Sequence, residues 1–157
     1  MNRTALKRLL LPLPELSETA AAVAGGLLLL RTGAGAMIFY IHGWHKLLGG
    51  IAYLVRDTPW KLAEEVAEMH APAPIAAAFL ATGVQFICSL FLIAGLFTRI
   101  NAVLLTGALA GAILQNLLAE RDPQLAILYT LVVANFAVTG AGRFSLDAKW
   151  FGRPASK

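Results

Sequence analysis

Long runs of apolar residues dominate the pattern of hydrophobic and polar positions along this chain. Three of them, 75–98, 100–119 and 123–142, contain no charged residue, and a fourth, 20–43, contains only Arg31. A helix needs about 20 apolar residues to cross a bilayer, and strands of a membrane barrel would alternate instead. The pattern therefore predicts an all-α integral membrane protein with four transmembrane helices.

The connections between these runs predict how the helices are arranged. The second and third turns, around residues 99 and 120–122, are short, and short connections force neighbouring helices to be antiparallel. We therefore expect a four-helix antiparallel bundle that forms a single domain over residues 1–157. An opening segment, 6–16, is short, basic and apolar, and we expect it to lie along the cytoplasmic surface.

The first connection, 44–74, is long and predicts a short amphipathic helix on the outer membrane face. Thr58 is expected to cap a helix that begins at Pro59. Helical spacing places Leu62, Val66 and Met69 on one face. The three glutamates, Glu64, Glu65 and Glu68, are expected to face away from it. Two interpretations remain open, a plain connector or a lid over a site.

Composition and charge support the membrane class and predict its orientation. Hydrophobic residues make up 58% of the chain and charged residues 14%, with a mean hydropathy of +0.68. With four spans, eight lysines and arginines lie on the side of the termini and four lie in the two opposite loops. The positive-inside rule then places both termini in the cytoplasm. The basic charge is therefore explained by the membrane, and we expect no nucleic-acid partner.

Arg31 is the one charge within the four apolar runs. A cation at that depth costs several kcal/mol unless it finds water or a partner. The best candidate partner is Asp147, just beyond the fourth run. Two interpretations are open: a charge clamp that fixes the C-terminal segment, or a site for an anion or a lipid headgroup.

The outer half of the bundle holds the candidate ligand-binding residues. They are polar side chains that the predicted helices bring towards one outward-facing cleft: His42, Lys46, Gln85, Gln115, Asn116 and Tyr129, with Asn135 deeper. A quinone needs an apolar slot with a few donors for its carbonyl oxygens, and this set supplies them. The alternative is that the amides only join helices to one another. His42 and His45 are spaced for a metal, but no third ligand is fixed nearby, so we predict no metal site.

Small residues mark where helices come close together. Gly107 and Gly111 form a Gly-x-x-x-Gly pattern that is typical of contact faces in membranes. The contact is either within the chain or between copies, so a homo-oligomer is one of the expected outcomes.

Three motifs, RTGAGAMIFYIHGWHKL, GLFTR and GAGRFSLD, give the chain a family resemblance. Together they resemble the DoxX/DoxD family of small four-helix membrane proteins. That resemblance implies a bacterial inner-membrane protein, and it implies a glutamate in helix two where this chain has Gln85. Some family members are parts of quinone-linked thiosulfate-oxidising systems or sit in thiol-redox complexes.

The sequence therefore leads to two functional hypotheses. The first is a component of a bacterial inner-membrane redox system, an oxidoreductase or a subunit of one, that handles quinone or a small sulfur or thiol compound. The second is a non-enzymatic membrane anchor or partner subunit for another protein.

Overall fold

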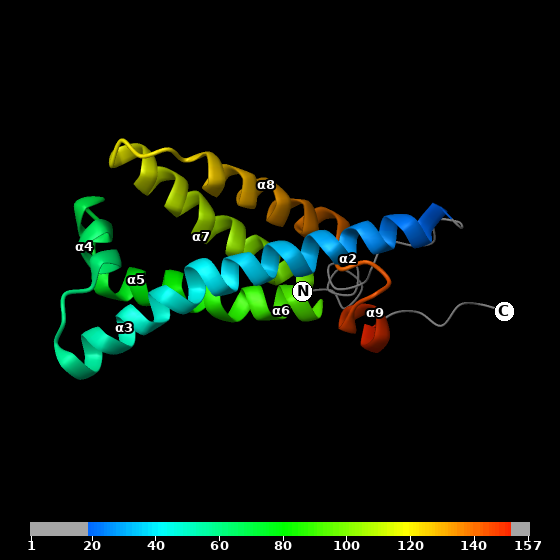
Figure 1. Cartoon of the computed structure of the whole chain (residues 1–157), viewed down its shortest axis with the longest axis horizontal. Coiled ribbons are helices and arrows are strands. Elements are labelled where there is room, and N and C mark those ends of the chain that lie inside the picture. The colour runs from blue at the N-terminus through cyan, green and yellow to red at the C-terminus, as the bar shows by residue number, and fades with distance from the viewer. Residues whose placement is uncertain (1–18, 152–157) are drawn as a thin grey trace, which may run out of the picture.

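The computed structural model describes residues 19–151, and the regular elements of this part are all helices (Figure 1). Its elements in chain order are α2 (Thr19–Met37), the π-helical segment η1 (Ile38–Trp44), α3 (His45–Arg56), α4 (Lys61–Glu68), α5 (Pro74–Gly83), the π-helical segment η2 (Val84–Cys88), α6 (Ser89–Ala94), α7 (Thr98–Leu118), α8 (Gln124–Thr139) and α9 (Leu146–Phe151). The predicted surface segment 6–16 lies outside the described residues.

Three helices are long and apolar enough to cross a membrane. The first runs without a break through α2, η1 and α3 for 36 residues, Ala21–Arg56. The second, Pro74–Ala94, comprises α5, η2 and α6, and the third is α7. The fourth apolar helix, α8, has 16 residues and is shorter. The chain is thus a multi-pass membrane protein.

Two predicted boundaries in the first half of the chain were wrong. The first helix does not end at residue 43, because nothing in HGWHKLL breaks a helix; it ends at Asp57, which adopts a left-handed conformation (φ 51°). The amphipathic helix exists, but it begins at Lys61 and not at Pro59. Trp60 is held extended before it, since its buried ring packs against Phe79 and Tyr53.

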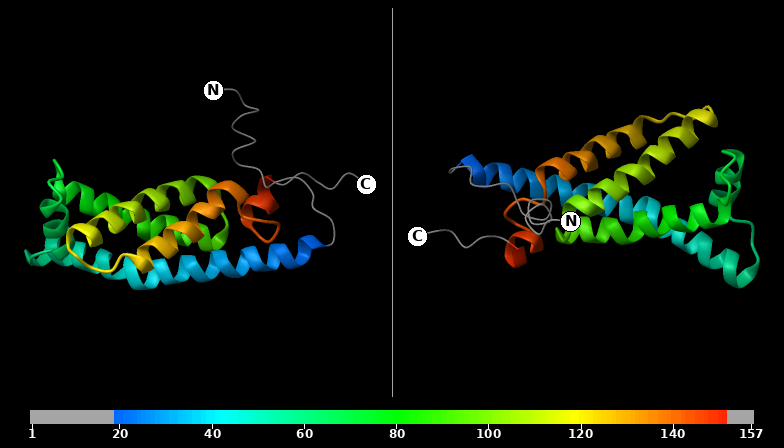
Figure 2. Two further views of the ribbon diagram at one scale, coloured as in Figure 1. Left: turned by 90° about the horizontal axis from the view of Figure 1, so that it is seen from above. Right: turned by 180° about the vertical axis from the view of Figure 1, so that it is seen from behind.

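The helices form a bundle that is closed at one end and open at the other. α7 and α8 pack along each other, and α2 packs against α6. Figure 1 shows α7 and α8 diverging from α5 towards the end where α4 stands across the gap. Both views in Figure 2 place α9 at the opposite end from α4. We call these the α4 end and the α9 end.

The apolar core of the bundle lies between α7, α8 and the first two long helices. Its fully buried members include Ile38, Leu92, Leu105, Val133 and Phe136. A smaller cluster around Trp60, Leu62 and Ala78 ties α4 to α5. α4 is therefore packed onto the bundle and is not a free connector.

Candidate functional site

The two π-helical segments face each other and bring the first two long helices close together. η1 packs against η2, and Gly43 lies at the contact. A Cβ at Gly43 would come within 3.1 Å of Phe86 Cα and 3.2 Å of the Gln85 carbonyl oxygen. Single π-turns inside α-helices are frequent at functional sites. Here η1 and η2 form the helix–helix contact that lies beside Gln85.

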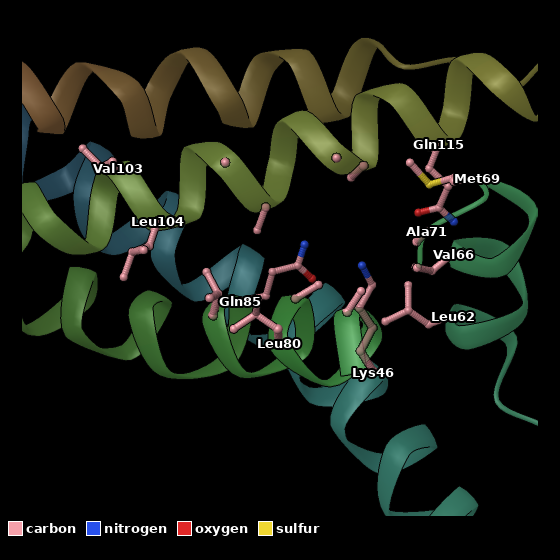
Figure 3. A pocket seen from close by; sticks show the side chains of 17 residues that line it. Lys46, Leu62, Val66, Met69, Ala71, Leu80, Gln85, Val103, Leu104 and Gln115 are labelled. Carbon is pink, nitrogen blue, oxygen red and sulfur yellow. The ribbon is translucent and has the colours of Figure 1, made fainter. Parts of the chain in front are cut away.

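A cavity of about 550 Å³ lies next to this contact, between α5 and η2 on one side and α7 on the other. α4 borders it at the mouth, and Lys46 reaches it from α3 (Figure 3). Only three of its lining residues are polar: Lys46, Gln85 and Gln115. Its size lies in the range of sites for small ligands, which are mostly apolar with a few placed polar groups.

Small residues on α7 create this space. Gly107, Ala108, Gly111 and Ala112 line the cavity, and a Cβ on either glycine would meet nothing within 4 Å. The Gly-x-x-x-Gly pattern was predicted to be a helix contact face. Within this chain the two glycines instead border the cavity, because α5 and α7 diverge here.

The polar side chains of the cavity differ in how well they are satisfied. Gln85 is 1% exposed, and its Oε1 has no hydrogen-bond partner. Lys46 makes no hydrogen bond and no ion pair within 4.0 Å with the described part of the chain. Gln115 donates from Nε2 to Glu65 Oε2. Two of the three polar groups therefore remain available to a ligand.

Glu65 fastens α4 across the mouth of the cavity. Besides the bond from Gln115, its Oε1 accepts a hydrogen bond of 2.9 Å from Arg121 Nη1, and Lys61 Nζ lies 4.0 Å away. The sequence analysis wrongly placed Glu65 on the outward face. Its spacing was the missed signal, since it follows Leu62 by three residues and precedes Met69 by four, which puts all three on one side of a helix.

A second cavity, of about 430 Å³, lies between α4 and the end of α7. It is more polar, and Glu65, Glu68, His70 and Arg121 are among its lining residues. Gln115 borders both cavities. The Glu65–Gln115 bond therefore lies at the boundary between them.

Three of the predicted ligand-binding residues do not line the apolar cavity: His42, Tyr129 and Asn116. The His42 ring meets the edge of the Tyr129 ring at 5.8 Å, and Tyr129 donates to Met37 Sδ at 3.6 Å. Tyr129 is on α8, and α7 separates α8 from the cavity. The Lys46 charge acts on the His42 ring, so the two side chains lie near each other, but only Lys46 lines the cavity.

Two other predictions for this region have an outcome in the structure. Asn135 does not join the predicted cleft, because its side chain is exposed on the surface of α8. In the described part of the chain, no three histidine, cysteine or acidic side chains gather in a way that would hold a metal ion.

At the α9 end, Arg31 is fully enclosed and bonded to the backbone. It is 1% exposed, and it donates from Nη1 to the Ala141 carbonyl at 3.1 Å and from Nη2 to the Phe144 carbonyl at 2.9 Å. These bonds tie α2 to the segment that connects α8 with α9. The geometry favours the clamp interpretation, since an enclosed guanidinium leaves no room for a headgroup.

Asp147 acts at the same junction: its charge attracts Arg31, but its hydrogen bonds go to backbone groups. Its carboxylate accepts the backbone N–H groups of Phe97 at 2.7 Å and Thr98 at 2.9 Å, which caps the start of α7. No ion pair within 4.0 Å links it to Arg31 among the described residues. The two residues clamp the C-terminal segment through backbone groups, because the turns of this junction present carbonyl and N–H groups that no helix uses.

Gly95 is the residue of this junction that the sequence analysis did not assign a role. It has a left-handed φ of 69°, and a Cβ there would lie 1.8 Å from Arg31 Nη1 and 2.6 Å from Ser145 Cβ. The glycine thus leaves the space that Arg31 occupies. Its place directly after an apolar helix, in GLFTR, was the available signal.

Comparison with known families identifies the chain. The DoxX family profile matches residues 26–119, which include most of the first long helix, all of the next two and the whole cavity lining. The GAGRFSLD motif lies beyond this match. Searches of curated proteins and of solved structures gave no significant match. Because the profile covers more than half of the sequence, this chain belongs to the DoxX family.

Proposed function

We propose that this protein is a component of a bacterial inner-membrane redox system and that its apolar cavity holds the small molecule on which that system works. A quinone is the first candidate ligand, and a small sulfur or thiol compound is the second. In this proposal all four apolar helices span the membrane and both termini are cytoplasmic. The bias of eight cations against four supports that orientation.

The observation that carries the proposal is the cavity at the α4 end. Its walls are apolar, and some of its lining side chains are also exposed on the surface that faces lipid in a membrane: Leu80 is 71% exposed and Val103 is 60% exposed. A membrane-soluble molecule can therefore enter sideways between α5 and α7. Lys46 then supplies a donor for its polar head, and Gln85 supplies an amide whose Oε1 has no partner.

The roles of the candidate residues follow from this geometry. Lys46, Gln85 and Gln115 bind the head of the ligand, and α4 covers it. His42, Tyr129 and Asn116, which the sequence placed in the same cleft, support the packing of the helices in this proposal.

The test is extraction and mass spectrometry of small molecules from the purified protein. A Gly107→Leu variant should fill the cavity, since nothing lies within 4 Å of a Cβ there. Gly33→Leu is the matched control, because Gly33 is equally open but lies on α2 outside the cavity. We expect a quinone or sulfur compound in the wild type and in the control and its loss from Gly107→Leu. Absence of any compound, or equal amounts in all three proteins, would contradict the proposal.

One observation supports the second hypothesis, a non-enzymatic partner subunit. Asn135 lies exposed among the apolar side chains of α8, where Leu131 is 65% exposed and Val138 is 73% exposed. An amide facing lipid is costly, and a neighbouring protein helix would satisfy it. A co-purifying subunit in stoichiometric amount, released by Asn135→Leu and accompanied by no small molecule, would favour this function.

A further inference from the structure

The cavity contains a positive charge, Lys46, that forms no ion pair within 4.0 Å with the described residues; the acid whose charge acts on it is Glu65 of α4. Lys46 Nζ points into the space between α5 and α7, as does the Gln85 amide (Figure 3). An ammonium group that leaves water costs free energy unless an anion or several acceptors replace the water. The cavity offers it apolar walls and, among fully buried side-chain oxygens, one without a partner, Gln85 Oε1.

The acid at the mouth of the cavity, Glu65, is already engaged. It accepts hydrogen bonds from Gln115 and Arg121, and Lys61 lies 4.0 Å from it. Its negative charge is therefore shared with two cations outside the cavity lining. Glu65 attracts Lys46 only from beyond ion-pair distance, so a counter-charge in direct contact with Lys46 would come from another molecule.

The remainder of the cavity indicates what that molecule carries besides its charge. Beyond Lys46, Gln85 and Gln115 the lining is apolar, and it continues to exposed side chains such as Leu80 and Leu104. A small hydrated anion would leave these walls in contact with water. A hydrocarbon chain covers them and gains about 25 cal/mol for each Å² that it removes from water.

From these observations we propose that the cavity binds a membrane amphiphile with an anionic oxygen head, a carboxylate or a phosphate, and one hydrocarbon chain. The head lies at Lys46 and takes a hydrogen bond from the Gln85 amide, and the chain extends between α5 and α7. This inference rests on the proposed role of the cavity as a ligand site. It narrows the ligand class to acids, whereas a quinone is neutral.

The experiment measures displacement of a fluorescent fatty acid from the purified full chain in detergent. The competitors are palmitate, hexadecyl phosphate, methyl palmitate, a short-tailed quinone and inorganic phosphate. A charge-assisted hydrogen bond contributes about 1.5–3 kcal/mol. We therefore expect palmitate or hexadecyl phosphate to bind about ten- to hundredfold more tightly than methyl palmitate and the quinone. The stronger of the two acids identifies the head group as carboxylate or phosphate.

Substitutions at Lys46 test whether this side chain causes the preference for the acid over its ester. Lys46→Met should abolish the preference for the acid while methyl palmitate still binds, and Lys46→Arg should retain it. Lys61→Met is the matched control at the same end, because the Lys61 side chain is 81% exposed and does not line the cavity; it should behave as the wild type. The ester-binding measurement in Lys46→Met shows at the same time that the variant is folded.

The outcomes separate this inference from the proposed function. If palmitate, its ester and the quinone bind equally, or if Lys46→Met keeps the preference, the anionic head is wrong and the ligand cavity stands. If inorganic phosphate competes as well as hexadecyl phosphate, the amphiphile is wrong. If no amphiphile and no quinone displaces the probe, both the inference and the proposed function fail.

Discussion

The two ends of the bundle surround a cation in different ways, although both cations lie on the same helix. At the α9 end, Arg31 is 1% exposed and both of its terminal nitrogens donate to backbone carbonyls. At the α4 end, the half-buried Lys46 borders the apolar cavity and has no hydrogen bond and no ion pair within 4.0 Å with the described residues, and Glu65 attracts it only from a greater distance. The two residues are separated by about 22 Å of helix.

The backbone around each cation accounts for the difference. The α9 junction is built from turns, with left-handed glycines at 95, 140 and 142, and turns leave carbonyl and N–H groups unused by any helix. The walls of the cavity are helices, whose carbonyl groups are already bonded along the chain. The terminal nitrogens of Arg31 therefore find backbone acceptors within the fold, although Arg31 Nε and Thr98 Oγ1 have no hydrogen-bond partner, and Lys46 finds no such acceptor in the cavity.

The largest effect should come from closing the space for Arg31. Gly95→Ala adds a Cβ that would lie 1.8 Å from Arg31 Nη1, at a residue with φ 69°. The guanidinium must move and lose its carbonyl acceptors, so we expect a loss of about 3–5 kcal/mol in the free energy of unfolding. Thermal unfolding in detergent measures it. Gly33→Ala, on open α2, is the control and should change stability little. Equal melting temperatures for the two variants would show that the α9 end has room for a Cβ at Gly95 beside Arg31.

The next effect concerns the two clamp residues. Arg31→Met leaves the Ala141 and Phe144 carbonyls without a donor and should cost about 2–4 kcal/mol. Asp147→Asn keeps one acceptor for the N–H groups that cap α7 and should cost about 1–2 kcal/mol. We expect the double variant to lose less than the sum, since both side chains hold the same segment. Strict additivity in unfolding measurements would mean that the two clamps act separately.

The sequence predicted the apolar helices and the importance of Arg31 and Asp147 better than it predicted the atoms to which these two residues bond. Arg31 and Asp147 were recognisable because a charge in an apolar run, and an acid just beyond one, demand explanation. Their hydrogen-bond partners are backbone atoms, which a sequence does not reveal. Of the residues predicted to line a cleft, Lys46, Gln85 and Gln115 line the cavity.

The residues whose positions differ from the prediction do so for different reasons. His42 was assigned to the cleft as the last residue of the first helix, but that helix continues through η1 into α3. The assignment of Tyr129 required knowing which side of α7 the helix α8 covers, and hydropathy does not indicate this. Glu65 was misplaced because its charge was given more weight than its spacing.

A smaller effect is expected where α4 covers the cavity. Glu65→Ala removes the bonds to Gln115 and Arg121 but leaves the Trp60 cluster in place, so stability should fall by only about 1 kcal/mol. Hydrogen exchange over residues 61–68 should become faster, because α4 then opens more often. Glu64→Ala, at an exposed position on the same helix, should leave exchange unchanged. Unchanged exchange in Glu65→Ala would show that apolar packing alone holds α4 in place.

The smallest effect should come from His42, and it tests where the site ends. His42→Ala removes an edge contact with Tyr129, which is outside the cavity lining, so the free energy of unfolding should fall by about 0.5–1.5 kcal/mol. Binding of the small molecule should stay as in the wild type.

Gln85→Leu should have the opposite effect on stability and binding, because it removes the cavity's buried amide without leaving a polar atom unpaired. Its stability should be preserved while binding weakens, by about tenfold for one hydrogen bond. Melting temperature and ligand retention measured on both variants decide the matter. If His42→Ala weakens binding as much as Gln85→Leu does, the ligand reaches beyond the cavity to the Tyr129 contact, and the site is larger than its lining.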